Sequence, residues 1–366
     1  MDKQKYNIRN SFTIFIQPTN SCNLACKYCY ISRDIKTEIM DEQTIWNILE
    51  KFICLSEDKP IHLLWHGGEP LLVGLDFYKK AIEIESRFGG KSKFENSIQT
   101  NGTLLTEEFA DFFKKYNFSM GLSLDGPKEL NDKTRIYKTN KSTFYSVLSS
   151  IKILRERGIE TNVIITLNKK NIRQTTQIYQ FLKEHKISAR FNPLVRAGRA
   201  VENYEELSIS PEEFKEAKLN IFNRWFSDKE PIHLYCFEDM LKNILSRNYI
   251  CECTFTDSCQ KSFISIAPQG DVYPCGEFSG IEKFRYGNIN KNSLEDILSH
   301  PLRVNLLGRE KNIRDCDIDC EYQKLCHGGC MSNAYGSTGN IMDKDPYCSA
   351  YKVLFKHIKS KIKYQN

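Results

Sequence analysis

Hydrophobic and polar positions follow two alternating periods over the first two thirds of the chain. Short apolar or alternating runs, typical of β-strands, recur six times between residues 12 and 227. They lie at 12–17, 61–66, 94–100, 118–125, 161–166 and 187–192. Between them are segments with apolar residues at helical spacing, for example Ile45, Ile48, Leu49 and Phe52. The pattern predicts six consecutive βα units.

Helix start signals support this assignment. Asp41, Thr106 and the pair Ser210-Pro211 each precede a run with helical spacing, and these residue types favour helix N-termini. Repeated βα units imply a parallel sheet with right-handed crossovers. Six units are too few for a closed eight-stranded barrel, so we expect an α/β fold with a partial (β/α)6 barrel of the TIM type. A doubly wound sheet is the alternative, and either architecture places chemistry at the C-terminal ends of the strands.

The character of the chain changes after about residue 228. Short apolar pieces, turn residues and many cysteines follow, and such a segment has little core of its own, so bound metal would stabilise it. We therefore expect two domains, a barrel over 8–227 and a small Cys-rich domain over 228–366. The last segment, 351–364, has apolar positions at helical spacing among lysines, which predicts a docking helix with a solvated basic face.

Composition limits the classes of partner. The 366 residues carry 52 Lys and Arg against 46 Asp and Glu, a net charge of +6 that is too small to indicate nucleic acid by itself. The N-terminus is polar, and no apolar run approaches the ~20 residues of a membrane span. We expect a cytoplasmic protein that binds neither nucleic acid nor membrane.

The 14 cysteines indicate bound metal, since disulfides are rare in a large, unexported chain. They fall into two groups, with none between Cys54 and Cys236. We expect Cys54 and Cys236 to be small core residues. Cys251 is either a spare or a replacement for Cys253, and His327 is expected to be a loop residue.

The first group, Cys22, Cys26 and Cys29, forms a CxxxCxxC motif directly after the first strand. Three thiolates on one loop can bind three irons of a [4Fe–4S] cluster, and the fourth iron then stays open for a substrate. Structural zinc is the alternative, but the next twenty residues offer no fourth ligand apart from acids.

A second motif, Gly67-Gly68-Glu69-Pro70, follows the second strand. Together with the cysteine triplet and Tyr28 just before its last cysteine, it resembles the radical S-adenosylmethionine (SAM) enzymes. The resemblance implies that the open iron chelates SAM and that the GGEP motif binds the methionine amino group. An electron from the cluster would then cleave SAM to methionine and a 5′-deoxyadenosyl radical.

Three further SAM contacts follow from the resemblance. Asn101 and Ser123 match the positions near the SAM ribose and methionine groups, and Arg135 is a candidate for a carboxylate contact. Turn formation is the alternative for Asn101 and Ser123, and a surface cation is the alternative for Arg135.

The second group of cysteines resembles the SPASM extension of radical SAM enzymes, which holds two auxiliary [4Fe–4S] clusters. The implied ligands are Cys253, Cys259, Cys275 and Cys330 for the first cluster, and Cys316, Cys320, Cys326 and Cys348 for the second. Three residues, where the family usually has two, separate Cys316 from Cys320. A pair of Cys₄ zinc sites is the alternative.

The segments QTNGTL, GLSLDGPKEL and LCHGGC are similar to the peptide-maturase and anaerobic sulfatase-maturating branches of this family. The sulfatase-maturating enzymes carry an Asp directly after the cysteine of a YPC motif, whereas this chain has Gly276 and then Glu277. We therefore predict a maturase that introduces a thioether or carbon–carbon crosslink, or an epimerised residue, into a ribosomally made peptide. Glu277 or an auxiliary cluster would take up the released proton or electron.

The alternative function is oxidation of Cys or Ser to formylglycine, with Glu277 replacing the missing Asp. A non-catalytic zinc or iron–sulfur protein would leave the GGEP motif unexplained. The resemblance implies three [4Fe–4S] clusters and SAM as cofactors, with a peptide or protein substrate and a low-potential donor of the flavodoxin or ferredoxin type as partners. Because the first strand starts at residue 12, we expect a leader peptide to be recognised by the barrel and SPASM surfaces or by a separate protein.

Overall fold

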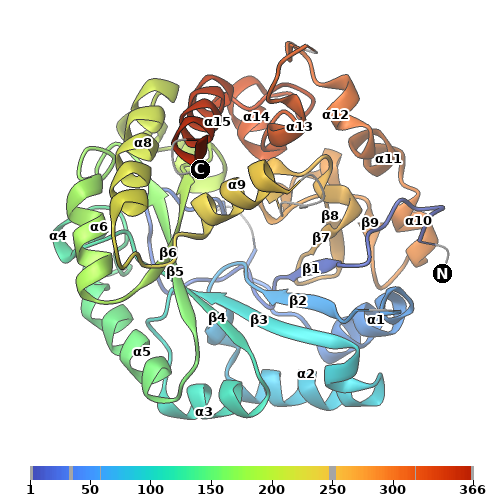
Figure 1. Cartoon of the computed structure of the whole chain (residues 1–366). Coiled ribbons are helices and arrows are strands. Elements are labelled where there is room, and N and C mark those ends of the chain that lie inside the picture. The colour runs from blue at the N-terminus through green and yellow to red at the C-terminus, as the bar shows by residue number, and fades with distance from the viewer. Residues whose placement is uncertain (1–2, 33–35, 58, 247–252, 318, 364–366) are drawn as a thin grey trace.

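The computed structural model describes residues 3–32, 36–57, 59–246, 253–317 and 319–363 (Figure 1). Within these ranges nine strands form one sheet in the order β6-β5-β4-β3-β2-β1-β7-β8-β9. The strands are β1 (Thr13–Ile16), β2 (Ile61–Trp65), β3 (Phe94–Thr100), β4 (Ser119–Ser123), β5 (Thr161–Leu167), β6 (Ser188–Pro193), β7 (Phe263–Ile266), β8 (Asp271–Tyr273) and β9 (Gly287–Asn288).

The first six strands confirm the predicted βα units. Every neighbouring pair from β1 to β6 is parallel. The strands follow one another in chain order without a reversal, which a doubly wound sheet would require. The structure therefore confirms the partial barrel, and the alternative of a doubly wound sheet is wrong.

Helices cover the outer side of this sheet (Figure 1). In the barrel region they are α1 (Glu42–Phe52), α2 (Leu75–Arg87), α3 (Glu107–Lys115), α4 (Lys128–Asn131), α5 (Phe144–Glu156), α6 (Thr175–Glu184), α7 (Tyr204–Leu207) and α8 (Pro211–Ser227). Later helices are α9 (Tyr235–Leu245), α10 (Leu294–Leu298), α11 (Pro301–Leu307), α12 (Arg309–Asn312), α13 (Gln323–Cys326), α14 (Met331–Thr338) and α15 (Cys348–Lys363). Short 3₁₀ turns that bear on the site are η2 (Pro70–Val73), η4 (Gly198–Val201) and η7 (Gly276–Phe278).

The predicted start signals cap the helices they precede. Asp41 accepts a hydrogen bond from the amide of Thr44 at 2.7 Å, which stabilises the start of α1. Thr106 caps α3 in the same way, and Ser210 forms a capping box at the start of α8.

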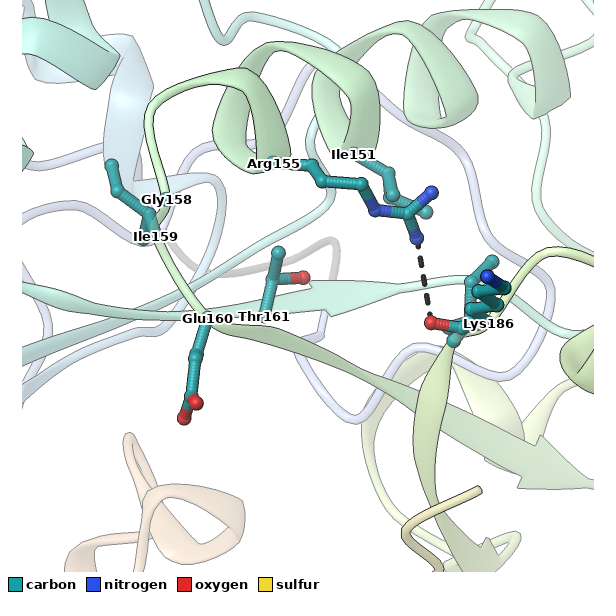
Figure 2. A pocket seen from close by; sticks show the side chains of 8 residues that line it. Ile151, Arg155, Gly158, Ile159, Glu160, Thr161 and Lys186 are labelled. Carbon is teal, nitrogen blue, oxygen red and sulfur yellow. Dashed lines mark hydrogen bonds between the residues drawn. The ribbon is translucent and has the colours of Figure 1, made fainter. Parts of the chain in front are cut away.

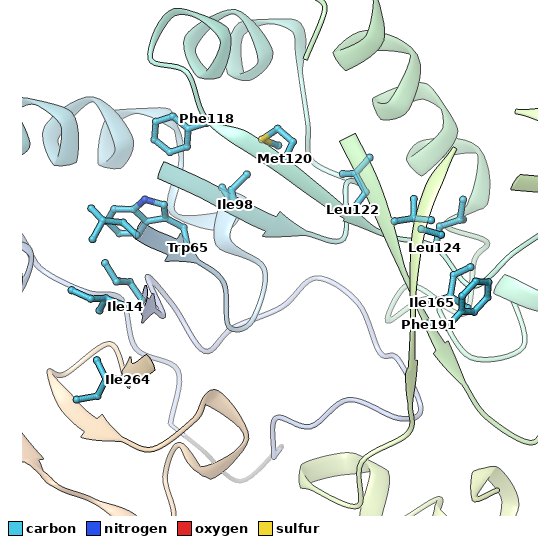
Figure 3. Close-up of a cluster of buried hydrophobic side chains, with 14 of the residues drawn as sticks. Ile14, Trp65, Ile98, Phe118, Met120, Leu122, Leu124, Ile165, Phe191 and Ile264 are labelled. Carbon is cyan, nitrogen blue, oxygen red and sulfur yellow. The ribbon is translucent and has the colours of Figure 1, made fainter. Parts of the chain in front are cut away.

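Apolar side chains from neighbouring strands form a continuous core (Figure 3). Trp65 on β2 packs edge-on against Phe77 and Tyr78 of α2, with ring centroids 5.8 Å apart in both pairs. Its strand neighbour Ile98 on β3 is paired in turn with Met120 on β4. The core thus fixes the strands against their helices and leaves the loops after the strands to carry the chemistry.

The sheet continues into the Cys-rich segment. β7 pairs with β1 in parallel, with Thr13 opposite Phe263 and Ile16 opposite Ile266, and β8 and β9 add antiparallel strands. The sequence pattern did not predict these strands. The boundary at 227/228 stays a prediction, although the sheet extends across it.

The final helix confirms the predicted docking helix. α15 packs against α8 and α9 and buries Leu354, Phe355 and Ile358. It begins at Cys348, three residues before the expected start. Among the described residues, no helix combines the length and the hydropathy that a bilayer span needs.

Candidate active site

The loop that carries Cys22, Cys26 and Cys29 is held from two sides. Residues 24–27 run along residues 134–137, where the amide of Ala25 donates to the carbonyl of Ile136 at 2.8 Å. On the other side, the amide of Ala200 in η4 donates to the carbonyl of Cys29 at 3.1 Å. The three thiols are therefore presented by a fixed backbone, as a metal site requires.

The GGEP motif lies directly against the segment that leads into this loop. The amide of Gly68 donates to the carbonyl of Thr19 at 3.0 Å, and the amide of Glu69 donates to the carbonyl of Ser21 at 2.7 Å. A Cβ atom on Gly68 would lie 2.0 Å from the Ser21 oxygen, so only glycine fits there. The structure thus brings together the two motifs on which the family resemblance depends.

Glu69 joins the loops after β2 and β3. Its carboxylate is fully buried and accepts hydrogen bonds from the amide of Leu71 at 2.9 Å, the hydroxyl of Thr100 at 2.6 Å and the amide of Asn101 at 2.8 Å. Burial raises the pKa of Glu69 to about 7, against the opposing effect of these hydrogen bonds.

The predicted SAM contacts Asn101 and Ser123 both lie at this edge of the sheet. The side-chain nitrogen Nδ2 of Asn101 lies 3.7 Å from the Cys22 sulfur and donates to the side-chain oxygen of Asn23 at 2.9 Å. Ser123 accepts a hydrogen bond from the Gln99 side chain at 3.2 Å. Asn101 is therefore beside the cysteine loop, and Ser123 is one strand further from it.

Tyr28 and Arg135 contact one buried carboxylate that sequence reasoning did not single out. Asp125 is fully buried; it accepts a hydrogen bond from the Tyr28 hydroxyl and lies 3.3 Å from Nε of Arg135. The Arg135 guanidinium stacks 5.2 Å from the Tyr28 ring centroid. Arg135 is only 8% exposed, so the alternative of a surface cation is wrong. The Asp125-Gly126-Pro127 turn after β4 was the available sequence signal for this carboxylate.

The eight predicted SPASM ligands come together in the predicted two sets. After burial, the largest influences on the pKa of Cys275 include Cys253 and Cys330, and Cys259 acts on Cys253, so these four lie near one another. The second set is Cys316, Cys320, Cys326 and Cys348. Nearby Cys316 and Cys320 raise the pKa of Cys326 and that of Cys348, so these four also lie near one another.

Asp345 connects the two sets. Its side chain accepts from the amide of Cys330 at 2.9 Å, and its carbonyl accepts from the amide of Cys348 at 3.0 Å. Asp345 is fully buried, and burial raises its pKa. One residue therefore fixes a cysteine of each set, which no sequence motif indicated.

The three cysteine sets suit iron–sulfur clusters. Burial raises the pKa of Cys22 to about 11 and that of Cys26 to about 12, and neighbouring thiolates add to both. A cation relieves this cost, and thiolates are the ligands that [4Fe–4S] clusters require. Among the described residues, no three His, Cys, Asp or Glu side chains are arranged around a single metal ion. A four-iron cluster needs no such arrangement, because each thiolate binds a different iron.

Tyr30 lies between the first cysteine loop and the SPASM cysteines. Burial raises its pKa well above the ordinary value, and nearby Cys29, Glu277, Cys275 and Cys22 raise it further. Its hydroxyl lies 3.3 Å from the carbonyl of Gly67 in the GGEP motif. Sequence reasoning missed this tyrosine, because a single aromatic residue carries no periodic signal.

Glu277, the predicted catalytic residue, is partly buried in η7. It accepts a hydrogen bond from Ser332, and the Cys275 sulfur lies 3.6 Å from its carboxylate. Burial raises its pKa. The preceding residue, Gly276, has no space for a side chain, because a Cβ atom would lie 2.8 Å from the Phe15 ring.

Two other cysteines and the histidine that the sequence singled out have no described side-chain contact with the three cysteine sets. Cys54 lies 3.2 Å from the carbonyl of Lys51, and Cys236 accepts from the ammonium of Lys218 at 3.2 Å. His327 lies in a loop, 2.8 Å from Glu310, as expected. Cys251 lies outside the described residues.

A cavity of about 250 Å³ is found at the opposite ends of the strands (Figure 2). Residues 158–161, before and at the start of β5, and residues 186–187, before β6, line it. Arg155 on its wall already donates to the carbonyl of His185 at 2.8 Å. We assign it no part in the chemistry of the cysteine loops.

Comparisons with known proteins agree with this geometry. Residues 16–182 match the family model of the radical SAM superfamily, and residues 253–330 match that of the SPASM iron–sulfur cluster-binding domain. The chain is 29% identical to a cysteine-type anaerobic sulfatase-maturating enzyme of Clostridium novyi, covering 97% of both chains. It is also 29% identical to a serine-type enzyme of Bacteroides thetaiotaomicron, over 94% of this chain and 89% of the relative.

A solved structure has the same fold. It is the native enzyme named anSMEcpe with bound AdoMet and a Cp18Cys peptide, which matches with a TM-score of 0.83 and 25% identity over 96% of this chain and 98% of that one. The two domain types imply [4Fe–4S] clusters and SAM as cofactors. The buried thiol sets, the joined GGEP loop and these matches lead to one assignment: the chain belongs to the radical SAM superfamily of enzymes and carries a C-terminal SPASM domain.

Proposed function

We propose that this enzyme oxidises a Cys or Ser side chain of a peptide or protein to formylglycine. The observation that carries the proposal is similarity along the whole chain to sulfatase-maturating enzymes of both the cysteine and the serine type. A peptide-bound structure of the same fold supports a peptide as the substrate.

The three cysteine sets would hold clusters with different roles. Cys22, Cys26 and Cys29 would hold the SAM-binding cluster, and the eight SPASM cysteines would hold the two auxiliary clusters. When bound, the first cluster and SAM supply a radical that abstracts hydrogen, and the auxiliary clusters accept an electron. The proposed SAM-binding residues are Tyr28, the GGEP motif Gly67-Gly68-Glu69-Pro70, Asn101, Ser123 and Arg135. An electron donor of the flavodoxin or ferredoxin type is the proposed second partner.

Within this scheme the chain's own residues fix the geometry. Glu69 holds the loops after β2 and β3 together through three hydrogen bonds. Asp125 holds Tyr28 and Arg135 in place beside the cysteine loop. The backbone of residues 134–137 holds that loop through backbone hydrogen bonds. Glu277 stays the sequence-based prediction for the group that takes up a proton.

A second candidate is the crosslinking or epimerising peptide maturase that the sequence favoured. One observation supports it: the place of the missing Asp is taken by Gly276, with the Phe15 ring against it. The relatives support sulfatase-type maturation more strongly, because their similarity extends over both domains.

The test uses the reconstituted enzyme under anaerobic conditions with SAM and dithionite. Peptides carrying the maturation segment of a sulfatase are offered with Cys, Ser or Ala at the modified position, and Ala is the matched control. We expect 5′-deoxyadenosine together with an aldehyde, detected by hydrazine derivatisation and mass spectrometry, from Cys or Ser only. If 5′-deoxyadenosine forms but no peptide yields an aldehyde, the formylglycine function is wrong and the second candidate is favoured.

A further inference from the structure

His66 occupies a position between the two kinds of cysteine set. It directly follows β2 and precedes the GGEP motif, and its amide donates to the carbonyl of Ile16 at 2.9 Å. Its ring centroid lies 5.0 Å from that of Phe15 and 6.0 Å from that of Tyr30. Tyr30 is the residue that lies near both Cys22 and Cys275. His66 therefore lies close to Tyr30, between the Cys22 loop and the SPASM cysteines.

The side chain of His66 is left with an unsatisfied polar atom. Its Nδ1 is buried and has no hydrogen-bond partner among the described residues. A buried polar atom without a partner is destabilising, so a retained one indicates that a ligand supplies the partner. Burial, and the charge of Arg135, lower the pKa of His66 to about 4, so the imidazole is neutral and one of its ring nitrogens carries a free lone pair.

The Phe15 ring relates His66 to the position where the relatives' acid is missing. It packs against His66 on one side, and it fills the space that a side chain at position 276 would need. Position 276 is where sulfatase-maturating enzymes carry their Asp, by the resemblance described above. His66 and position 276 are therefore both next to one ring.

Glu277 is less well placed for the same task. Its carboxylate already accepts from Ser332, and it faces Cys275 at 3.6 Å. These contacts direct it toward the SPASM cysteines. The Nδ1 atom of His66, in contrast, has no hydrogen-bond partner among the described residues.

We propose that His66 is the catalytic base of this enzyme and takes up the proton that leaves the substrate's S–H or O–H group. This inference rests on the proposed formylglycine function. Oxidation removes two electrons from the substrate: the Cβ hydrogen atom leaves to the SAM-derived radical, the proton leaves to His66, and the remaining electron leaves to an auxiliary iron–sulfur cluster. A Ser substrate becomes the aldehyde directly. A Cys substrate becomes a thioaldehyde, which water converts to the aldehyde and hydrogen sulfide.

The test compares His66→Ala and His66→Gln with His62→Gln in the cluster-loaded enzyme. His62 lies on β2, four residues before His66, and contacts Ser97 at 2.6 Å, so it is a matched control. Iron content, 5′-deoxyadenosine and peptide aldehyde are measured for each. General base catalysis contributes about 10²–10⁴-fold, so we expect both His66 variants to lose at least about 100-fold in aldehyde formation and to keep 5′-deoxyadenosine formation within about twofold.

Chemical rescue separates a base from a structural role. Added imidazole is expected to restore aldehyde formation in His66→Ala by at least about tenfold, and to have no effect on His66→Gln, which has no cavity to receive it. The proposal is overturned if His66→Ala makes aldehyde at the parent rate, or if it loses aldehyde and 5′-deoxyadenosine equally. It is also overturned if Glu277→Gln, and neither His66 variant, loses aldehyde formation while 5′-deoxyadenosine formation is kept.

Failure of the proposed function gives a different result. If the parent enzyme makes no aldehyde from the Cys or the Ser peptide, that function is wrong, and protection of His66 decides the present proposal. Diethyl pyrocarbonate modifies neutral imidazole, and mass spectrometry locates the modified histidine. Protection of His66 by SAM and the Cys peptide supports its place at the substrate, whereas equal modification with and without them overturns it.

Discussion

The contact between Phe15 and Gly276 provides a quantitative test of the site. A Cβ atom at position 276 would lie 2.8 Å from two atoms of the Phe15 ring, whereas carbon atoms in contact are normally about 3.5–4.0 Å apart. Phe15 is only 7% exposed, and its ring is confined by His66 and by Phe263, whose centroid is 6.1 Å away. The ring therefore cannot move aside without disturbing other contacts.

Replacing Gly276 by Ala should therefore destabilise the folded enzyme. Overpacking of this kind costs about 1–3 kcal/mol, and the lower entropy of Ala in the unfolded chain offsets about 0.4–1 kcal/mol of it. An unfolding entropy of about 2.1 cal/mol/K per residue over 366 residues gives roughly 0.8 kcal/mol/K. Each kcal/mol then lowers the melting temperature by roughly 1.3 °C, so Gly276→Ala should melt about 1–3 °C lower.

A double-mutant cycle with Phe15→Leu identifies the cause. The shorter Leu side chain removes the close contact, so in that background Gly276→Ala should keep only the gain of about 0.4–1 kcal/mol, a coupling of about 1–3 kcal/mol. Melting is followed by circular dichroism under argon at one scan rate, with iron content checked because Cys275 is adjacent. Gly308→Ala is the control, since its Cβ would lie 3.3 Å from a flexible Asn312 side chain. Equal losses with and without Phe15, or no loss in the single variant, would refute the reasoning.

Three further predictions concern buried groups of the barrel. Burial raises the pKa of Glu85 to about 7 from an ordinary 4.5, so its contribution to stability is complete below about pH 4.5 and is lost as the pH rises through 7. The rise from 4.5 to about 7 corresponds to at most about 3.4 kcal/mol, and Glu85→Gln should remove most of the fall in melting temperature between about pH 4.5 and 7, whereas exposed Glu83→Gln should not. Gly68→Ala should abolish loading of the first cluster, seen as a loss of about four irons per chain, because its Cβ would overlap the Ser21 carbonyl. Asp125→Asn should cost about 3–5 kcal/mol and lower the soluble yield, because it leaves a buried cation uncompensated; unchanged melting would contradict this.

Sequence patterns predicted the barrel because its elements are local. Each of the six strands and the three examined helix caps depends on residues within a few positions of one another, so their periods and capping residues are visible in the chain. The short strand Phe263–Ile266 was not predicted as part of the same sheet. Its partner β1 lies about 250 residues earlier, and four apolar residues carry no information about which edge they join.

The candidate site was predictable to the extent that it consists of motifs. Spacing indicated the cysteine triplet, whereas the family resemblance implied the role of the GGEP turn and the division of eight cysteines into two sets. The contacts of Arg135 were not predictable in the same way. Its partner Asp125 begins an Asp-Gly-Pro sequence that is typical of turns, so nothing in the sequence indicated a buried ion pair. His66 and Tyr30 are single residues whose surroundings come from three separate segments, so only the folded chain relates them.

Strand β1 explains why the two kinds of cysteine set lie near one another. Its C-terminal end leads into the Cys22 loop, and one neighbour, β2, leads into the GGEP motif. Its Phe15 and the following Gln17 both contact the segment after Cys275: Phe15 at Gly276, and Gln17 at Ser279 through a 2.7 Å hydrogen bond. Because one short strand orders the SAM-binding loop and the start of η7, a shift of Phe15 would change the distance between the radical-forming centre and the nearest auxiliary cluster. The residue that follows Cys275 is therefore constrained by β1 as well as by chemistry, which is a physical reason for this chain to carry glycine there and for the proposed base to lie elsewhere, directly after β2.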